Sequence, residues 1–229
     1  MNHDSLGRVL VSRRPNSSRA TARWKHGLVN LNVPECYGLT DIQRILDRFA
    51  PRLLAARPTL RYDAPMSLRF PGVEFRIARQ RVAPDHILIR SSLPESSVEV
   101  PETFDFDAPE STPRISNALC TIARKIAPEV LMPRVRELAE AVGRRPQGWA
   151  FSTGYRTLGT CSSRGIITLS SALVFLPQEL RDYIVLHEIA HLSEMNHSPR
   201  FHAVLDGYLG GREAILVNRL KIYSWPVLR

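Results

Sequence analysis

The chain has 229 residues, of which 44% are hydrophobic, and a formal net charge of +9 at pH 7. This length and composition allow one substantial core or two small ones, and they exclude an intrinsically disordered protein. No apolar run approaches the roughly 20 residues that a membrane-spanning helix needs. The cysteines are odd in number and far apart, which argues against a disulfide framework and favours a reducing, cytoplasmic setting; they are Cys36, Cys120 and Cys161.

The excess positive charge lies in the first 91 residues. Residues 1–91 hold 16 Lys or Arg residues against 7 Asp or Glu residues, whereas residues 92–229 hold 15 of each kind. Nearly all of these basic residues are arginines, whose planar side chain suits phosphate and carboxylate groups. This part therefore predicts a surface for nucleic acid or another polyanion, and the alternative is a solvated surface without a ligand.

The same residues, 1–91, are predicted to be rich in β-strands. Alternating segments at 9–11 and 28–33 indicate a β-hairpin with a turn near His26 and Gly27. Thr40 and Gln43 form a capping box for a helix that Pro51 is expected to kink or end. Further strands are predicted at 66–70, 73–79 and 86–90.

The next segment, 92–114, is interpreted as an acidic, Pro-rich linker or long loop, because it carries four prolines, six acidic residues and one arginine. Residues 115–142 then have a helical pattern that Pro128 and Pro133 are expected to break into two helices, the second ending at Gly143.

The C-terminal part, 115–229, is predicted to be a separate catalytic domain or to continue one domain with the preceding residues. Strands are expected at 149–153 and 165–170, and a helix that Pro177 opens is expected to end near Asn196. A last helix is expected from Pro199 through Leu209. Together with the N-terminal strands, these elements predict an α+β fold.

The most informative motif is His-Glu-x-x-His at residues 187–191, followed by His197. On a helix, His187 and His191 are one turn apart on one face, so both can bind a single metal ion. Glu188 then lies beside them, where it can act as the general base toward a metal-bound water. Three histidines leave a fourth coordination position open, which is typical of a catalytic zinc site.

Two other interpretations of these histidines stay open. They could belong to a surface helix without a metal, or to a structural zinc site, for which only Cys161 is available as a fourth ligand. Among neighbouring residues, His202 is either a group that supports the site or a solvent-facing helical residue, while Tyr155 and Tyr183 are candidates for stabilising an oxyanion.

A wider pattern surrounds the motif in five stretches, which are Leu158-Gly159-Thr160-Cys161-Ser162, Ile166 to Leu169, Leu176-Pro177, His187 to His191, and Asn196 to His202. In these stretches the chain resembles the YgjP-like metallopeptidases, relatives of the SprT and WLM proteases. That family has Trp-Gly-Ser-Cys-Ser, a strand, a Leu-Pro helix start, His-Glu-Leu-x-His and Asn-His-Ser-x-x-Phe-Trp. Leu158 and His202 stand where the family has tryptophan, which bears on substrate preference more than on metal binding.

The resemblance covers roughly residues 149–205 and implies a zincin-like catalytic domain of the small gluzincin (minigluzincin) type around an active-site helix. It implies one zinc ion per chain, with His187, His191 and His197 as ligands and Glu188 as the catalytic base. The predicted function is hydrolysis of peptide bonds in a peptide or protein substrate. The alternatives are a metal-dependent nucleotide phosphohydrolase, a DNA-associated SprT-like protease, and a non-catalytic zinc module, against which the intact Glu188 argues.

Overall fold

The computed structural model describes residues 1–25, 28–55, 60–81, 83 and 86–228. It has a mixed α+β fold, as predicted, and it contains two compact units. One unit comprises Met1–Asp63, Asp105–Asn117 and Val227–Arg229, and the other comprises Ala64–Phe104 and Ala118–Pro226. The assignment of separate functions to residues 1–91 and 115–229 stays a prediction.

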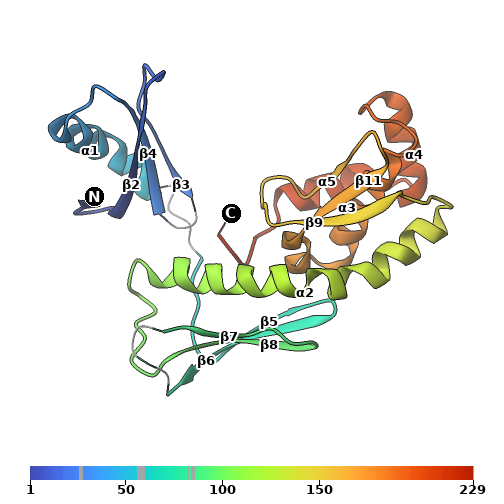
Figure 1. Ribbon diagram of the computed structural model, residues 1–229, viewed down its shortest axis with the longest axis horizontal. Coiled ribbons are helices and arrows are strands. Elements are labelled where there is room, and N and C mark those ends of the chain that lie inside the picture. The colour runs from blue at the N-terminus through green and yellow to red at the C-terminus, as the bar shows by residue number, and fades with distance from the viewer. Residues whose placement is uncertain (26–27, 56–59, 82, 84–85, 229) are drawn as a thin grey trace. The chain divides into compact units, whose positions relative to one another are not determined.

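The first unit is a four-stranded sheet with one helix on it (Figure 1). The sheet order is β1-β2-β4-β3. Its elements are β1 (Asn2–His3), β2 (Gly7–Arg14), β3 (Thr21–Lys25), β4 (Leu28–Pro34) and α1 (Leu39–Ala55). The predicted pairing of 9–11 with 28–33 in a hairpin is wrong, because β2 runs parallel to β4 and the antiparallel partner of β4 is β3. The predicted turn at His26 and Gly27 lies outside the described residues.

The start of this unit's helix differs from the prediction, and one of the two effects expected of Pro51 is wrong. Thr40 is already inside α1 and does not precede it. The first turn is instead closed by Asp41, whose Oδ2 accepts the N–H of Gly38, the residue before the helix, at 3.0 Å. Pro51 does not end the helix, which continues to Ala55. Apolar side chains one turn apart hold α1 against the sheet, since Ile42, Leu46, Ala50 and Leu53 are buried with Val9, Val29, Leu31 and Val33.

The second unit contains a four-stranded sheet of order β5-β6-β8-β7. Its strands are β5 (Met66–Phe70), β6 (Val73–Gln80), β7 (Leu88–Arg90) and β8 (Glu95–Pro101). The first three confirm the predicted strands. The interpretation of 92–114 as linker or loop is corrected over Glu95–Pro101, because this strand lies inside the sheet between β6 and β7. The alternating pattern of a half-exposed strand is absent there, since β8 is buried on both faces from Val98 to Pro101, and its buried residues include the polar Ser96 and Glu99.

The helix α2 (Ser111–Ala141) is continuous, contrary to the predicted break. Pro128 and Pro133 both lie inside it, and Figure 1 shows the helix bending in its second half, as prolines within a helix cause. Burial of one face compensates for the lost hydrogen bonds, with Ile122, Ile126 and Leu131 almost inaccessible. Gly143, at a φ of 63°, follows the helix end as predicted.

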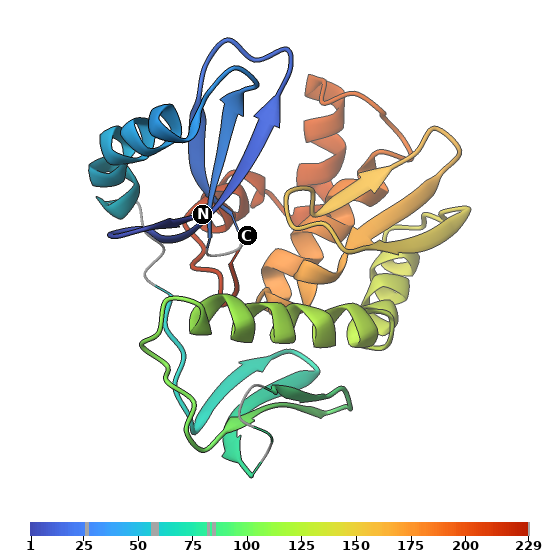
Figure 2. The same ribbon diagram turned by 60° about the vertical axis from the view of Figure 1, so that its left-hand side comes forward.

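The remaining elements of this unit carry the histidine motif. They are β9 (Gly148–Ser152), β10 (Gly159–Cys161), β11 (Ile166–Ser170), the 3-10 helix η1 (Ser171–Phe175), α3 (Gln178–Ala190), α4 (Pro199–Leu209) and α5 (Glu213–Lys221). The three strands form a sheet of order β10-β11-β9, in which β9 and β11 are parallel and β10 is an antiparallel edge strand (Figure 2). The predicted strands near 149–153 and 165–170 are confirmed.

One helix end differs from the sequence prediction in this region, and one further helix is present. The motif helix α3 ends at Ala190 and not near Asn196, because tighter bonds from the Leu192 and Ser193 N–H groups to Ile189 and Ala190 close its last turn. The helix Pro199–Leu209 has the predicted bounds but is followed by α5.

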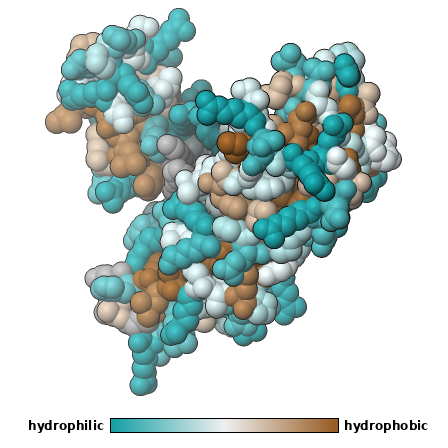
Figure 3. All heavy atoms as spheres, turned by 45° about the vertical axis from the view of Figure 1, so that its right-hand side comes forward, coloured by the Kyte–Doolittle hydropathy of each residue, from teal (hydrophilic) through white to brown (hydrophobic). Residues whose placement is uncertain are grey.

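Hydrophilic residues cover most of the face shown in Figure 3, with smaller apolar groups between them. Among the described residues, no helix combines the length and apolarity that a bilayer crossing requires.

Candidate metal centre

Three histidines from two neighbouring segments converge at the C-terminal end of α3. His187 lies in the last turn of α3, His191 follows its last residue, and His197 comes from the loop that leads to α4. One nitrogen of each ring lies within 4.8 Å of the others, and the Nε2 atoms of His187 and His197 are 3.0 Å apart. Two nitrogens on one zinc ion are at most about 4.2 Å apart, since each bond is about 2.1 Å. The spacing is therefore close to that of one shared cation.

Phe201 forms the apolar support beneath the three histidines. It is fully buried in the first turn of α4, and its ring stacks on that of His191 with centroids 4.5 Å apart. The ring of His187 meets it edge-on at 4.9 Å, and that of His197 at 4.8 Å. Ser198 caps α4 by accepting the Phe201 N–H, which fixes this ring next to His197. The loop and the cap thus bring the third histidine back to the first two.

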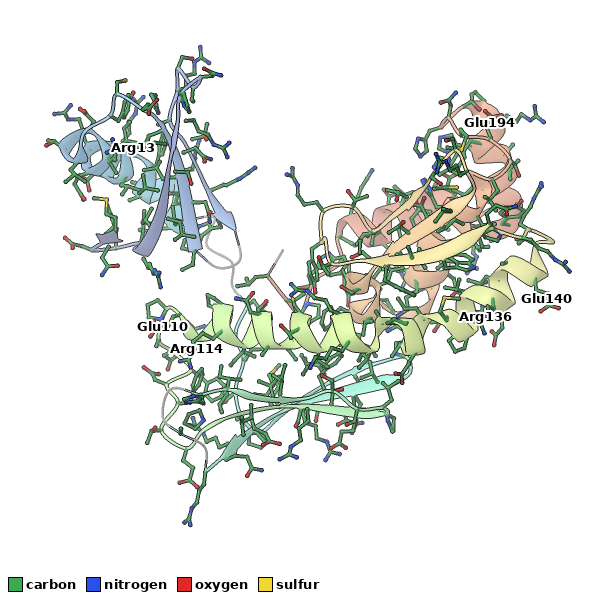
Figure 4. The ribbon with its side chains drawn as sticks, in the orientation of Figure 1. Arg13, Glu110, Arg114, Arg136, Glu140 and Glu194 are labelled. Carbon is green, nitrogen blue, oxygen red and sulfur yellow. The ribbon has the colours of Figure 1, made fainter. Side chains whose placement is uncertain are left out.

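Hydrogen bonding and burial leave these rings suited to binding a cation. Nδ1 of His191 lies 3.1 Å from the Glu194 carbonyl oxygen, in the loop marked by Glu194 in Figure 4. A proton on that nitrogen leaves Nε2 as an electron-pair donor. Burial lowers the pKa of His187 to about 4 and also lowers the pKa of His191, so both rings are neutral at pH 7. The Nδ1 atom of His187 is buried without a hydrogen-bond partner among the described residues. The donor set fits a divalent metal such as zinc.

Glu188 lies beside the histidines and is only 5% exposed. Burial raises the pKa of this carboxyl group to about 7. Gly159 of β10 makes room for it, because a Cβ at residue 159 would lie 2.6 Å from both Cγ and Oε1 of Glu188. The edge strand β10 and the helix α3 therefore hold the carboxylate between them.

The other residues singled out in the sequence have more peripheral positions. His202 is exposed and its Nδ1 lies 2.7 Å from Oε1 of Glu213, as expected for a surface residue. Cys161, on β10, is outside the histidine cluster; burial and the nearby Glu188 raise the pKa of its thiol. Burial raises the pKa of Tyr155, whose hydroxyl interacts with Cys120. Tyr183 packs edge-on against His187, with ring centroids 6.0 Å apart.

Two residues of this site had no role assigned from the sequence. Gly159 and Phe201 are both within the compared motif stretches, but only the structure shows one making room for Glu188 and the other supporting the imidazoles. The sequence signals that could have indicated these roles are a glycine upstream of the motif helix and an aromatic residue four positions after His197.

A buried carboxylate beside three converging imidazoles is the side-chain set of a metal-dependent hydrolase. Residues 19–218 match the family of the YgjP-like metallopeptidase domain. The chain therefore belongs to the YgjP-like metallopeptidase family, and it is a metallohydrolase that acts on peptide or protein substrates. No curated protein matches it.

Two solved structures are similar over part of the chain. The metallopeptidase zymogen abylysin of Pyrococcus abyssi has 23% identity and a TM-score of 0.36, with 39% of this chain and 90% of that chain covered. The metallopeptidase zymogen jannalysin of Methanocaldococcus jannaschii has 23% identity and a TM-score of 0.35, with 40% and 92% covered.

Proposed function

We propose that this chain is a zinc metallopeptidase whose ion is bound by His187, His191 and His197 and whose general base is Glu188. The convergence of the three rings beside the buried carboxylate is the observation that carries the proposal. The same arrangement leads us to propose a zincin-like fold of the minigluzincin type for the catalytic part. When bound, zinc supplies Lewis acidity, which polarises a peptide carbonyl and acidifies a water molecule.

The side chains of the site would have two further roles, metal binding and proton transfer. The three imidazoles hold the ion with neutral donors, so they do not reduce its positive charge. Glu188 accepts a proton from the attacking water and passes it to the amine that leaves. Its burial favours this role, because burial disfavours the charged carboxylate and so makes it a stronger base.

The edge strand β10 is our candidate for binding the substrate main chain. It is the outermost strand of its sheet, so its outer edge presents backbone groups that an extended peptide can pair with. Gly159 on this strand lies against Glu188, so a peptide paired with β10 would lie next to the proposed general base.

The nucleotide phosphohydrolase alternative has less support. Enzymes of phosphate chemistry commonly use two metal ions and many carboxylates. Within the described part of the chain, the three histidines form the one cluster of three or more His, Cys, Asp or Glu side chains that could hold a metal.

Zinc analysis, with hydrolysis assays on an unfolded protein and on nucleotides before and after chelation, tests the proposal of a zinc metallopeptidase. Activity on nucleotides alone would contradict it.

We expect His197→Ala to lose most of its zinc, because two imidazoles from α3 remain and the third donor is absent. Elemental analysis after dialysis measures the content. His202→Ala is the matched control, since this exposed histidine is paired with Glu213, and it should keep one zinc per chain. Equal zinc content in the two variants would show that His197 is not a ligand.

Gly159→Ala should keep the metal but slow peptide hydrolysis by about 100-fold, because the new methyl group displaces the Glu188 carboxylate and small misplacements of catalytic groups are costly. Zinc content and kcat are measured on the same preparation. Gly207→Ala serves as the control, since a Cβ there meets nothing within 4 Å. A wild-type kcat in Gly159→Ala would mean that the carboxylate tolerates displacement or has no catalytic part.

A further inference from the structure

An arginine-lined cavity lies in the second unit, and none of its lining residues belongs to the candidate metal centre. Its volume is about 1060 Å³. Its main walls are the C-terminal part of α2, which carries Arg136 and Glu140 (Figure 4), the loop from α2 to β9, and the turn between β10 and β11. Trp149 of β9 and Leu192, which follows α3, complete the lining. The loop and the turn are joined by a hydrogen bond from the Gln147 N–H to the Gly165 carbonyl. The cavity is thus built by segments far apart in the sequence.

Positive charge is concentrated around this cavity. Four arginines line it, namely Arg136, Arg144, Arg145 and Arg164. The carboxylate that lines it is Glu140, so four positive charges face one negative charge. Such a cluster produces a positive potential within a concave surface, which attracts anions.

These arginines also lack the partners that arginines elsewhere in the chain have. Within the described residues, no carboxylate forms an ion pair with Arg136, Arg145 or Arg164, and Arg144 donates to the Tyr208 hydroxyl at 3.1 Å. By contrast, nine other arginines lie within 4.0 Å of a carboxylate; they are Arg44, Arg61, Arg69, Arg76, Arg81, Arg90, Arg134, Arg200 and Arg219. The guanidinium groups at the cavity are therefore available to a ligand.

An aromatic side chain accompanies this charge. Trp149 on β9 is half-buried and lines the cavity together with Leu192. An indole beside guanidinium groups suits a ligand that has both a planar ring and phosphate groups, because bases stack on aromatic side chains and arginine binds phosphate in a bidentate manner. An acidic peptide would use the arginines but would leave the indole without a ring to stack on. The volume suits a ligand of nucleotide size.

We propose that this cavity binds a nucleotide unit, either free or within single-stranded nucleic acid, with its phosphate on the arginines and its base against Trp149. Its lining includes none of the residues that we propose for the peptidase chemistry. Its test is a binding measurement that needs no hydrolysis, so its failure would leave the proposed function untouched.

The probe is a fluorescein-labelled oligothymidylate of about 12 nucleotides, followed by fluorescence anisotropy at several salt concentrations. We expect the triple variant R136Q/R145Q/R164Q to bind at least about tenfold more weakly at low salt. Its log–log salt slope should fall by about two, since each contact to a single strand contributes about 0.7. The matched control is R69Q/R76Q/R81Q, which also removes three charges from the second unit but from arginines already paired with carboxylates. It should bind within about twofold of the wild type.

Trp149→Leu separates base stacking from charge. It should weaken oligothymidylate binding by about fivefold or more, because stacking on an aromatic side chain is lost, while competition by inorganic pyrophosphate stays unchanged. Competition by adenosine monophosphate at concentrations comparable with the oligonucleotide would identify a free nucleotide as the ligand. Binding of the oligonucleotide without such competition would identify the nucleic-acid strand.

Three outcomes would overturn the inference. One is an equal loss of affinity in the two triple variants, which would indicate general electrostatic attraction. Another is loss of binding in R13Q/R14Q/R19Q with none in the cavity variant, which would place the polyanion surface on the N-terminal strands. The third is full competition by polyglutamate with no effect of Trp149→Leu, which would indicate an acidic peptide ligand.

Discussion

Glu188→Gln is expected to keep one zinc per chain and to lose peptide hydrolysis by about 10³-fold. The amide has nearly the same shape as the carboxylate, so it fits the buried space between Gly159 and α3. It cannot accept the proton of the attacking water, and a positioned general base typically accelerates a reaction by 10²- to 10⁴-fold. The imidazoles that we propose as metal ligands are unchanged. Zinc content by elemental analysis and kcat on an unfolded protein substrate check both parts.

A control on the same helix tests whether the loss of hydrolysis is specific to the position of Glu188 or follows from any Glu→Gln change in α3. Glu179→Gln makes the same substitution in the first turn of α3, where the carboxylate pairs with Arg219. It should retain wild-type hydrolysis, because this exposed ion pair contributes little. Loss of zinc in Glu188→Gln would instead make Glu188 a ligand or a structural residue. Unchanged hydrolysis with full zinc would contradict the proposed general base.

The histidine cluster could be predicted because it is almost entirely local. His187 and His191 are related by one helical turn, and Pro199 with the capping Ser198 marks the start of the next helix. These rules act over a few residues, so they also predicted the bounds of α4 and the strands β5 and β6. The support from Phe201 and the space provided by Gly159 depend on packing between elements, which the sequence pattern does not contain.

The failures concern interactions between segments far apart in the sequence. Pro128 and Pro133 would break an isolated helix, but α2 buries enough apolar surface to remain continuous around them. The acidic, Pro-rich composition of 92–114 favoured a loop and so concealed β8. The charge of Glu99 is tolerated inside the sheet because Arg90 on the neighbouring strand pairs with it, and this pairing cannot be read from composition. The balance of charge after residue 91 likewise concealed the cavity arginines, since a count of charges does not show where they converge.

The other large effect is expected for stability, where Arg181→Met should lower the free energy of unfolding by about 3–5 kcal/mol. Arg181 lies in α3 and is only 4% exposed. Its guanidinium donates to three backbone carbonyls, those of Pro71, Val174 and Leu176. Burial lowers the pKa of this side chain to about 10, so it is still charged at pH 7. Methionine keeps much of the volume but leaves these three carbonyls, two of them in buried hydrogen bonds, without their donor.

Urea unfolding of the metal-free protein measures this difference, since bound zinc would add its own stabilisation to the folded state. Arg219→Met is the control, because Arg219 is an exposed arginine paired with Glu179 and its loss should cost less than about 1 kcal/mol. If Arg181→Met does not fold, Arg181→Lys takes its place and should be intermediate, since one ammonium group cannot reach all three carbonyls. A decrease in the free energy of unfolding below about 1 kcal/mol in Arg181→Met, or in Arg181→Lys where it takes its place, would contradict the prediction. Arg181 joins the β5–β6 turn and the 3-10 helix to α3, so its removal should loosen the helix that carries His187 and Glu188.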